Sequence, residues 1–577
     1  MVILNRLPPE LLTNVFKYTP NNKLAELRNL IIDVDAPVLL DCIDAALFDK
    51  IAIAKNLDQR EPRIKNLPFF ITTLPETSEI SGVFDDGSTE VTCLASDFFK
   101  DNKSMDHVGK YVKRIHLYQT RYIRYDKHEM ESLVRFINSA MQLQSIRASI
   151  PISGITKKLT EMEIVVDAAE NMLSDGLDSL KFLKLFNYPV LASELSPSEY
   201  DFSKLKRLEL CYCVQNFDGS TWKLSNLKEL AITFATGIAP GVTSNMVSKN
   251  FPKLKKLSLK HGTIETIGTT DLVSLELSDM QIIPSTLDFH NITNLEELKL
   301  KRLGLPSIPN LKYLKNLNSL EITSEWGIVQ LGKLPNLPKL THLNLSDNKI
   351  SSVVTGFSHL PKLIELNLHN NELDSLKGLD DISSLIKLDV SRNKISSIIP
   401  LNCPKLVNLN LEGNKLTSLN GLEILLSITK LNVKQNNISD ISDLSLHSLR
   451  EFDISHNPVS NLRHLADFPA LRSLDLCGVP VKNFENLGDI GKLRNLKSLS
   501  LFENEIPAVE NFSLNYSLRS ATKIEKFNAE LKFEFDKLFG NNNELVISCL
   551  LGEATKSTVF SNLLMEIKRK EKSKKSR

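Results

Sequence analysis

The sequence has few of the features that mark a secreted, membrane-bound or metal-binding protein. Its 577 residues include seven cysteines, an odd number, and no two of them form a CxxC pair. Disulfide frameworks and zinc sites need regular, closely spaced cysteines, so this scatter favours free thiols in a reducing compartment. The start, MVILNRLPPE, lacks the apolar run of a signal peptide, and no apolar run reaches the length of about 18 residues that spans a bilayer. We therefore expect a cytoplasmic or nuclear protein without a membrane contact.

Charge of one sign is also missing. The chain has 70 Lys and Arg residues against 69 Asp and Glu residues, a formal net charge of +1. Such a chain has no global field that would attract nucleic acid. The motifs GxSxG, HExxH and GxxxxGK[ST] do not occur in it. We expect no enzymatic activity, no cofactor and no metal. What the sequence does have is length, too much for one ordinary core, which predicts several domains or one extended array.

The second half of the chain repeats one pattern. LTHLNLSDNKI at 340–350 returns as LIELNLHNNEL at 363–373, LIKLDVSRNKI at 385–395 and LVNLNLEGNKL at 406–416. Further copies start at Ile428, Leu449, Leu471 and Leu496, which sets the spacing at 21 to 25 residues. Weaker copies precede them and start at Leu180, Leu205, Leu227, Leu254, Leu272, Leu295 and Leu317. The chain from 180 to 510 is therefore one array.

The pattern LxxLxLxxNxL resembles the leucine-rich repeat. The resemblance implies an α/β solenoid, a horseshoe with a parallel sheet on its concave side. The physics agrees, because a short strand puts its leucines on one side and stacked units bury them as a continuous row. After each strand apolar residues recur three apart, as in Leu416, Leu419 and Leu422, which favours 3₁₀ turns over long helices.

The asparagines that follow the strands are predicted to be structural. A buried amide must be hydrogen-bonded or it costs about 1–3 kcal/mol. Stacked side by side, such amides can satisfy backbone groups of their own and of adjacent units. The ladder is expected to comprise Asn348, Asn371, Asn393, Asn414, Asn436, Asn457 and Asn504.

Outward strand positions form columns on the concave face. These columns are polar and of mixed sign, and a long, rigid, polar surface of this kind usually binds a protein or peptide. Each single residue could equally be a solvated strand residue. The expected partner contacts are His342, Asn344, Glu365, Asn367, His369, Lys387, Asp389, Glu412, Lys430, Lys434, Asp453, Asp475 and Phe502.

The front of the chain differs from the array. Pro8 and Pro9 suit a helix start, and Leu11, Leu12, Val15 and Phe16 give that helix an apolar face. LPPELLTNVFKY resembles the start of an F-box, a short helical bundle that docks on the Skp-type adaptor of cullin-RING ubiquitin ligases. The resemblance implies that adaptor contacts are made by Leu7, Pro8, Glu10, Leu11, Val15 and Phe16. The other interpretation is a helical cap of the solenoid.

The sequence thus predicts five segments. They are an F-box-like helical module (1–50), an irregular linker with early repeats (51–179), the leucine-rich repeats (180–510), a C-terminal cap (511–566) and a basic tail (567–577). Within the second segment FFITTL at 69–74 and EVTCLA at 90–95 read as strands, and 128–143 reads as a helix.

The functional hypothesis is a substrate-recognition subunit of a Skp-cullin-F-box ligase. In it the front binds the adaptor and the concave face binds an unidentified target protein, and the chain is one copy within the complex. The alternative is a leucine-rich scaffold outside the ligase system, similar to phosphatase-regulatory subunits of this repeat type. The sequence does not name the target or say whether its recognition needs phosphorylation.

Overall fold

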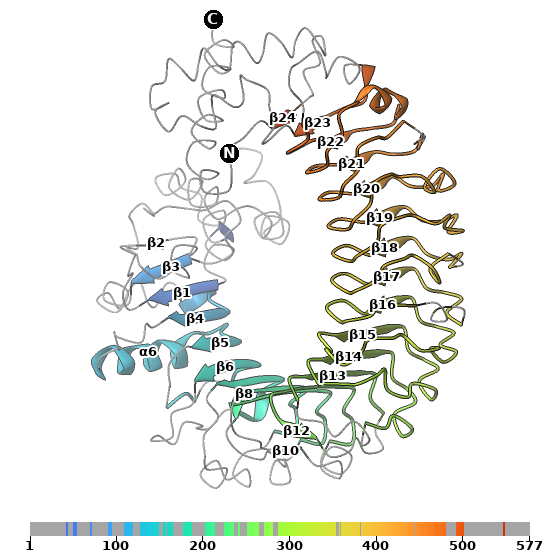
Figure 1. Cartoon of the computed structure of the whole chain (residues 1–577). Coiled ribbons are helices and arrows are strands. Elements are labelled where there is room, and N and C mark those ends of the chain that lie inside the picture. Colours follow the sequence, from blue (N-terminus) through green and yellow to red (C-terminus); the bar gives the residue numbers. More distant parts are fainter. Residues whose placement is uncertain are drawn as a thin grey trace, which may run out of the picture. The chain divides into compact units, whose positions relative to one another are not determined.

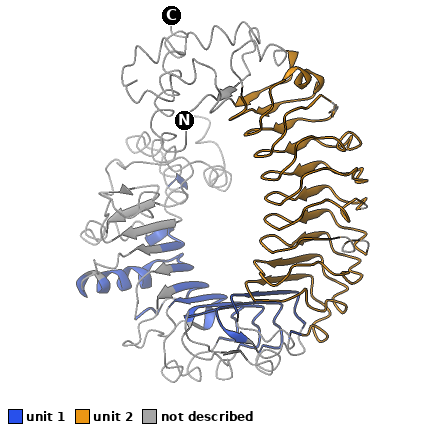
Figure 2. Ribbon diagram, viewed as in Figure 1, with its two compact units in different colours: residues 1–287 blue, residues 288–577 orange. Residues whose placement is uncertain are grey.

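The chain forms two compact units, residues 1–287 and residues 288–577 (Figure 2). The structure is a computed structural model. It describes residues 42–43, 50–54, 70–71, 91–94, 109–118, 127–148, 154–156, 158–165, 177–186, 202–213, 224–235, 241–242, 251–264, 271–280, 287–353, 357, 359–380, 382–442, 444, 446–480, 492–500 and 546–548.

The first unit is built on parallel strands. In chain order they are β1 (Lys50–Ala54), β2 (Phe70–Ile71), β3 (Val91–Leu94), β4 (Arg114–Tyr118), β5 (Ser145–Ala148), β6 (Glu161–Val165), β7 (Phe182–Phe186), β8 (Arg207–Cys213), β9 (Glu229–Phe234), β11 (Lys256–Lys260) and β13 (Ser274–Ser278). From β4 each strand pairs in parallel with the next of this series. Two short strands, β10 (Gly241–Val242) and β12 (Thr263–Ile264), pair separately.

Regular coils begin earlier than the clear sequence repeats. Strands β4, β5 and β6 lie in the segment expected to hold early repeats, and they join the same parallel sheet (Figure 1). The predicted strands at 69–74 and 90–95 are β2 and β3, which pair in parallel. The predicted helix at 128–143 is α6 (Lys127–Ser139), which ends four residues earlier than expected. A short 3₁₀ turn, Leu177–Ser179, precedes β7.

The second unit continues the same architecture with shorter strands. They are β14 (Glu297–Lys301), β15 (Ser319–Thr323), β16 (His342–Asn344), β17 (Glu365–Asn367), β18 (Lys387–Asp389), β19 (Asn408–Asn410), β20 (Lys430–Asn432), β21 (Glu451–Asp453), β22 (Ser473–Asp475), β23 (Ser498–Ser500) and β24 (Val546–Ser548). They pair in parallel, one with the next, with equivalent leucines opposite each other. The parallel-sheet solenoid predicted from the repeat is therefore confirmed.

The core of the second unit consists of stacked leucine rows. Leu343, Leu366, Leu388 and Leu409 occupy one row, and each is at most 2% exposed. Burying such a side chain contributes about 1.5–3 kcal/mol. The return segments add leucines three apart, and backbone N–H groups there donate to the carbonyl three residues earlier, as from Leu422 to Leu419 at 3.2 Å. The prediction of 3₁₀ turns is thus confirmed, and η4 (Arg463–Asp467) is a longer example.

The asparagine ladder is confirmed for its described members. The side chain of Asn414 donates to the carbonyls of Val390 (3.0 Å) and Leu411 (2.9 Å), and it accepts the N–H of Ile395 at 3.1 Å. One amide therefore joins its own coil to the coil before it. The same arrangement recurs at Asn348, Asn371, Asn393, Asn436 and Asn457, all of them buried.

Several predicted features lie outside the described residues. They include the six proposed adaptor contacts, namely Leu7, Pro8, Glu10, Leu11, Val15 and Phe16, together with Asn504 and Phe502. Of the expected F-box-like module only residues 42–43, in a helix, and Lys50 of β1 are described. Of the expected cap only β24 is described, and it pairs with β23.

Candidate functional site

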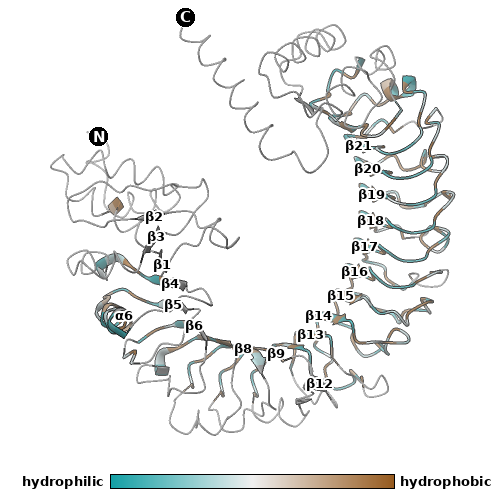
Figure 3. Ribbon diagram, turned by 60° about the vertical axis from the view of Figure 1, so that its left-hand side comes forward, coloured by the Kyte–Doolittle hydropathy of each residue, from teal (hydrophilic) through white to brown (hydrophobic). Residues whose placement is uncertain are grey.

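The outward side chains of β15 to β20 surround a hollow on the strand face of the second unit. Its volume is about 460 Å³. Because side chains alternate along a strand, the leucines point into the core and their neighbours point outward, and Figure 3 shows hydrophilic and hydrophobic residues alternating around these coils. The outward residues that line the hollow are Ser319, Glu321, His342, Asn344, Glu365, Asn367, Lys387, Asp389, Asn408, Asn410, Lys430 and Asn432.

The same type of hydrogen bond recurs along the column of outward residues between the two strand leucines. From β16 to β22 the side-chain oxygen of an Asn or Asp accepts the N–H of the residue two positions later, for example Ser346 to Asn344 at 3.0 Å and His369 to Asn367 at 2.9 Å. This bond turns the chain out of the strand, which explains strands of only three residues. The same bond occurs at Asp389, Asn410, Asn432, Asp453 and Asp475.

The remaining polar atoms of this column differ along the sheet. Asn410 donates to Asp389 at 3.0 Å, and Asn432 donates to Glu412 at 3.1 Å. The side-chain NH₂ groups of Asn344 and Asn367, in contrast, make no hydrogen bond within the described part of the chain. One end of the hollow therefore offers amide donors that a ligand can use.

Charged side chains flank the hollow in exposed pairs. Lys387 contacts Glu365 at 2.5 Å, His342 lies 3.9 Å from the same carboxylate, and Lys430 contacts Glu451 at 2.8 Å. Each such pair contributes about 0–1 kcal/mol, because water screens it. A partner can therefore exchange these ions for its own without a large loss.

Asp453 differs from the other acids of this face. Burial raises the pKa of its carboxyl group, and the nearby charge of Asp475 raises it further. Hydrogen bonds from the hydroxyl (2.6 Å) and the N–H (3.0 Å) of Ser455 act in the opposite direction. The carboxylate of Asp453 thus accepts hydrogen bonds from the turn that follows β21.

The structure brings most of the expected contact residues onto one face. The hollow unites His342, Asn344, Glu365, Asn367, Lys387, Asp389 and Lys430. The five remaining described ones, His369, Glu412, Lys434, Asp453 and Asp475, lie beyond its lining, and the His369 ring contacts the Ser391 hydroxyl at 2.7 Å. Glu321, Asn408, Asn410 and Asn432 line the hollow although they were not among the expected contacts. Their membership in the same columns was the available signal.

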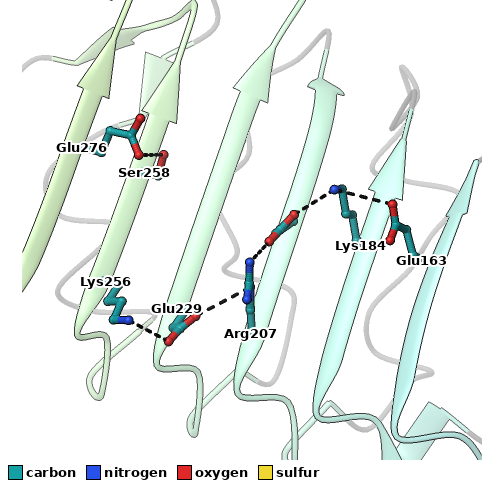
Figure 4. Close-up of polar contacts among 8 residues, drawn as sticks. Glu163, Lys184, Arg207, Glu229, Lys256, Ser258 and Glu276 are labelled. Carbon is teal, nitrogen blue, oxygen red and sulfur yellow. Dashed lines mark hydrogen bonds and ion pairs between the residues drawn. The ribbon is translucent and has the colours of Figure 1, made fainter. Parts of the chain in front are cut away.

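The strand face of the first unit has a different chemistry. Lys184 lies between Glu163 (3.6 Å) and Glu209 (3.2 Å), and Arg207 forms an ion pair with Glu209 (Figure 4). Glu229 continues the series by contacting Arg207 at 3.6 Å and Lys256 at 3.4 Å (Figure 4). Opposite charges thus alternate across five strands.

Burial shapes this charge series. Burial of the Lys184 ammonium group acts to lower its pKa, but the carboxylates of Glu163 and Glu209 outweigh that effect and the pKa is raised. Lys184 also lies 4.9 Å from the ring centre of Phe186. Burial likewise raises the pKa of the neighbouring Cys211 thiol, so this thiol is a poor nucleophile.

Neither a metal site nor a membrane span is found among the described residues. Nowhere in those segments do three or more His, Cys, Asp or Glu side chains gather as metal ligands would. The helices placed by the structure are all too short or too polar to cross a bilayer.

Comparison with known proteins identifies the repeats. The family model described as Leucine Rich repeats (2 copies) matches residues 338–381. The solved TLR13–ssRNA13 complex has a similar fold, with 15% identity, a TM-score of 0.50, and coverage of 80% of this chain and 76% of the other. An internalin from Listeria monocytogenes is 27% identical over 49% of this chain and 76% of its own, with a TM-score of 0.39. A leucine-rich-repeat protein from Leptospira interrogans is 20% identical over 78% and 92%, with a TM-score of 0.39. The chain thus contains leucine-rich repeats in a solenoid, an architecture that generally serves as a scaffold for protein binding.

Proposed function

We propose that the chain is a substrate-recognition subunit of a Skp-cullin-F-box type ubiquitin ligase, which binds its target protein on the strand face of the second unit. The observation that carries the binding part is the hollow on β15 to β20, with open amide donors at Asn344 and Asn367 beside exposed ion pairs. Amides that point outward from a rigid sheet can hydrogen-bond the backbone or side chains of a protein ligand.

A protein fits this face better than a nucleic acid does. Nucleic acid binding needs a run of Lys and Arg that neutralises several phosphates. Here Lys387 and Lys430 each contact a carboxylate, at 2.5 Å and 2.8 Å, and Glu321 and Asp389 also line the hollow. Phosphates would be repelled by these acids, whereas a protein surface offers both signs of charge.

The ligase part of the proposal rests on the sequence at the front of the chain. LPPELLTNVFKY resembles an F-box start, and the adaptor contacts would be Leu7, Pro8, Glu10, Leu11, Val15 and Phe16. A chain that binds the adaptor at one end and a target at the other raises the effective concentration of target lysines near the ligase. It needs no catalytic group of its own.

Co-purification of a Skp-type adaptor tests the ligase part. The full-length chain should recover the adaptor, and a Leu7→Ala, Pro8→Ala variant should recover much less because it lacks two apolar contacts. A Leu426→Ala, Ile424→Ala variant is a matched control, because both residues are apolar and exposed in the second unit. Equal recovery by wild type and the Leu7, Pro8 variant would remove this part.

The second candidate function is a scaffold outside the ligase system, such as a phosphatase-regulatory-type subunit. It shares the strand-face binding and differs only in the role of residues 1–50, which would then be a cap. In that case deletion of residues 1–50 leaves the set of captured proteins unchanged, and a phosphatase or signalling protein replaces the adaptor among them.

A further inference from the structure

The return segments between β14 and β17 carry many lysines and few acids. Between Arg302 and Glu372 only four acids occur: Glu321 and Glu365 lie on strands, Asp347 lies in the turn after β16, and Glu325 is buried. The return segments contain six lysines, all exposed, and one histidine. These are Lys312, Lys315, Lys333, Lys339, Lys349, Lys362 and His359.

These lysines stay outside the direct ion pairs of the described part of the chain, although the charge of Lys312 acts on Asp288. Among the residues that the structure describes, none of the six forms an ion pair with a carboxylate. Two of them bind neutral oxygens instead: Lys315 donates to the Asn336 carbonyl at 2.9 Å and Lys339 to the Asn316 side chain at 2.8 Å. These basic return segments contrast with the strand face, where lysines sit beside acids.

A groove of about 470 Å³ lies among these return segments. Two return segments form its walls, residues 307–311 and residues 330–336. The half-buried Ile308, Pro309 and Pro335 give it apolar walls above the buried Leu311 and Leu334, while Lys333 and His359 line it with basic side chains. Among the described residues that line the groove there is no Asp or Glu.

The two described walls of the groove are not joined to each other by backbone hydrogen bonds. The next pair of return segments is closed by hydrogen bonds, from Ser351 N to Val329 O (2.9 Å) and from Leu331 N to Ser352 O (3.2 Å). Between the described residues 306–310 and 329–336 no such backbone bond is formed. The space between these two walls is therefore accessible to a ligand chain.

One end of the groove is held rigidly by two unusual residues. Glu325 takes the ladder position of its coil, and its carboxylate accepts the N–H groups of Leu303 and Leu305, both at 2.8 Å. Gly327 packs so closely that a Cβ there would lie 2.6 Å from the carbonyl oxygen of Leu305. The adjoining segment is thereby fixed, so binding costs little conformational entropy there.

We propose that this groove is a second binding site, which takes an extended acidic segment of a partner protein. Apolar side chains of the segment would contact the half-buried Ile308, Pro309 and Pro335. Its carboxylates would contact Lys333 and His359, and also Lys315, which lies against the lining residue Asn336. A nucleic acid fits less well, because the groove is short and apolar and offers no exposed aromatic platform among its lining residues for base stacking. The site is independent of the strand face and of the ligase proposal.

Fluorescence polarisation with the full-length chain tests the proposal. The probe is a labelled peptide of about ten residues, extended at about 3.3 Å each, in which Glu and Asp alternate with Leu and Val. A Lys333→Glu, Lys315→Glu variant is expected to weaken its binding at least tenfold. The control variant Lys405→Glu, Lys415→Glu changes two exposed lysines of later coils and is expected to change binding less than twofold.

Further arms make the result decisive. Lys333→Gln, Lys315→Gln serves if charge reversal impairs folding, and it should weaken binding at least threefold with an unchanged thermal melt. Equal binding by wild type and both groove variants would overturn the proposal. So would competition by a (dT)₁₂ oligonucleotide or by vesicles of phosphatidylcholine with 30% phosphatidylserine at least as strong as by unlabelled peptide, since the site would then recognise negative charge alone.

Discussion

The strand faces of the two units differ in how their outward polar side chains are paired. In the first unit the outward side chains are Lys, Arg and Glu, which neutralise one another from Glu163 to Lys256. In the second unit, from β16 to β22, the equivalent positions hold Asn and Asp, whose oxygens bind the turn after each strand. The charged side chains of the first face pair with one another, whereas the second face leaves amide donors and a hollow accessible to a ligand.

The turns behind the strands differ in the same way. In the second unit Asn414 satisfies three backbone groups at once. In the first unit Met280 follows its strand at the ladder position, and its sulfur accepts the N–H of Gly262 at 3.3 Å. Sulfur is a weak acceptor and cannot donate. The regular repeat of the second half therefore reflects a demand of its buried turns, which the first half meets with weaker substitutes.

The largest expected effect is loss of a ladder amide. Asn414→Leu keeps the branched shape of the side chain but leaves the N–H of Ile395 buried without an acceptor, at about 1–3 kcal/mol. It also removes one of the two amide donors to each of the Val390 and Leu411 carbonyls, which keep Asn393 and Asn436, at about 0.5–1.5 kcal/mol each. We expect a loss of about 4 kcal/mol in the free energy of unfolding, measured by chemical denaturation. Met280→Leu, its counterpart in the first unit, should lose less than about 1.5 kcal/mol. Similar losses for both would remove the distinction between the two kinds of turn.

Glu325 should come next. Glu325→Ala leaves the N–H groups of Leu303 and Leu305 without acceptors, but it also removes a buried charge, so we expect a loss of about 2–3 kcal/mol. Glu325→Gln keeps one acceptor and should lose about half as much. A neutral effect of both substitutions in the same denaturation experiment would show that the carboxylate does not hold this segment.

The charge series of the first unit should matter more than the exposed pairs of the second. Lys184→Met removes the cation between Glu163 and Glu209, whose side chains are 14% and 15% exposed, and we expect a loss of about 1–2 kcal/mol. Lys387→Met breaks a pair with 55% and 37% exposure and should change stability by about 0.5 kcal/mol or less. The reverse order of these two values would contradict the comparison.

The smallest expected effect is on pH dependence. Burial raises the pKa of Glu325 above its usual value of 4.5, against the opposing hydrogen bonds from Leu303 and Leu305. The folded chain therefore takes up this proton at a higher pH than the unfolded chain does. Ionisation of Glu325 consequently lowers the free energy of unfolding. As the pH falls from 7 toward 4.5, the wild type should gain unfolding free energy relative to Glu325→Gln. A difference that stays constant or moves the other way would refute the assignment.

The repeat fixed most of the fold in advance because its spacing is short and its buried residues are demanding. The leucine rows, the 3₁₀ turns and the described ladder asparagines follow from period and residue type. The roles of Asn344 and Asp389 did not follow, because an outward amide looks the same in sequence whether it binds its own backbone or a ligand. Glu325 and Met280 were missed because each replaces the ladder asparagine with a different chemistry. The basic groove also went unnoticed, since it arises between coils.

Site-specific photo-crosslinking can show whether the strand face of the second unit binds the partner. A photoreactive residue at position 408 in the hollow would be compared with one at position 258, on the strand face of the first unit. In cells, we expect a discrete covalent adduct from position 408, which is lost when Asn344 and Asn367 are changed to Ala. We expect little adduct from position 258. An adduct from position 258 alone, or one from position 408 that is insensitive to those changes, would contradict it.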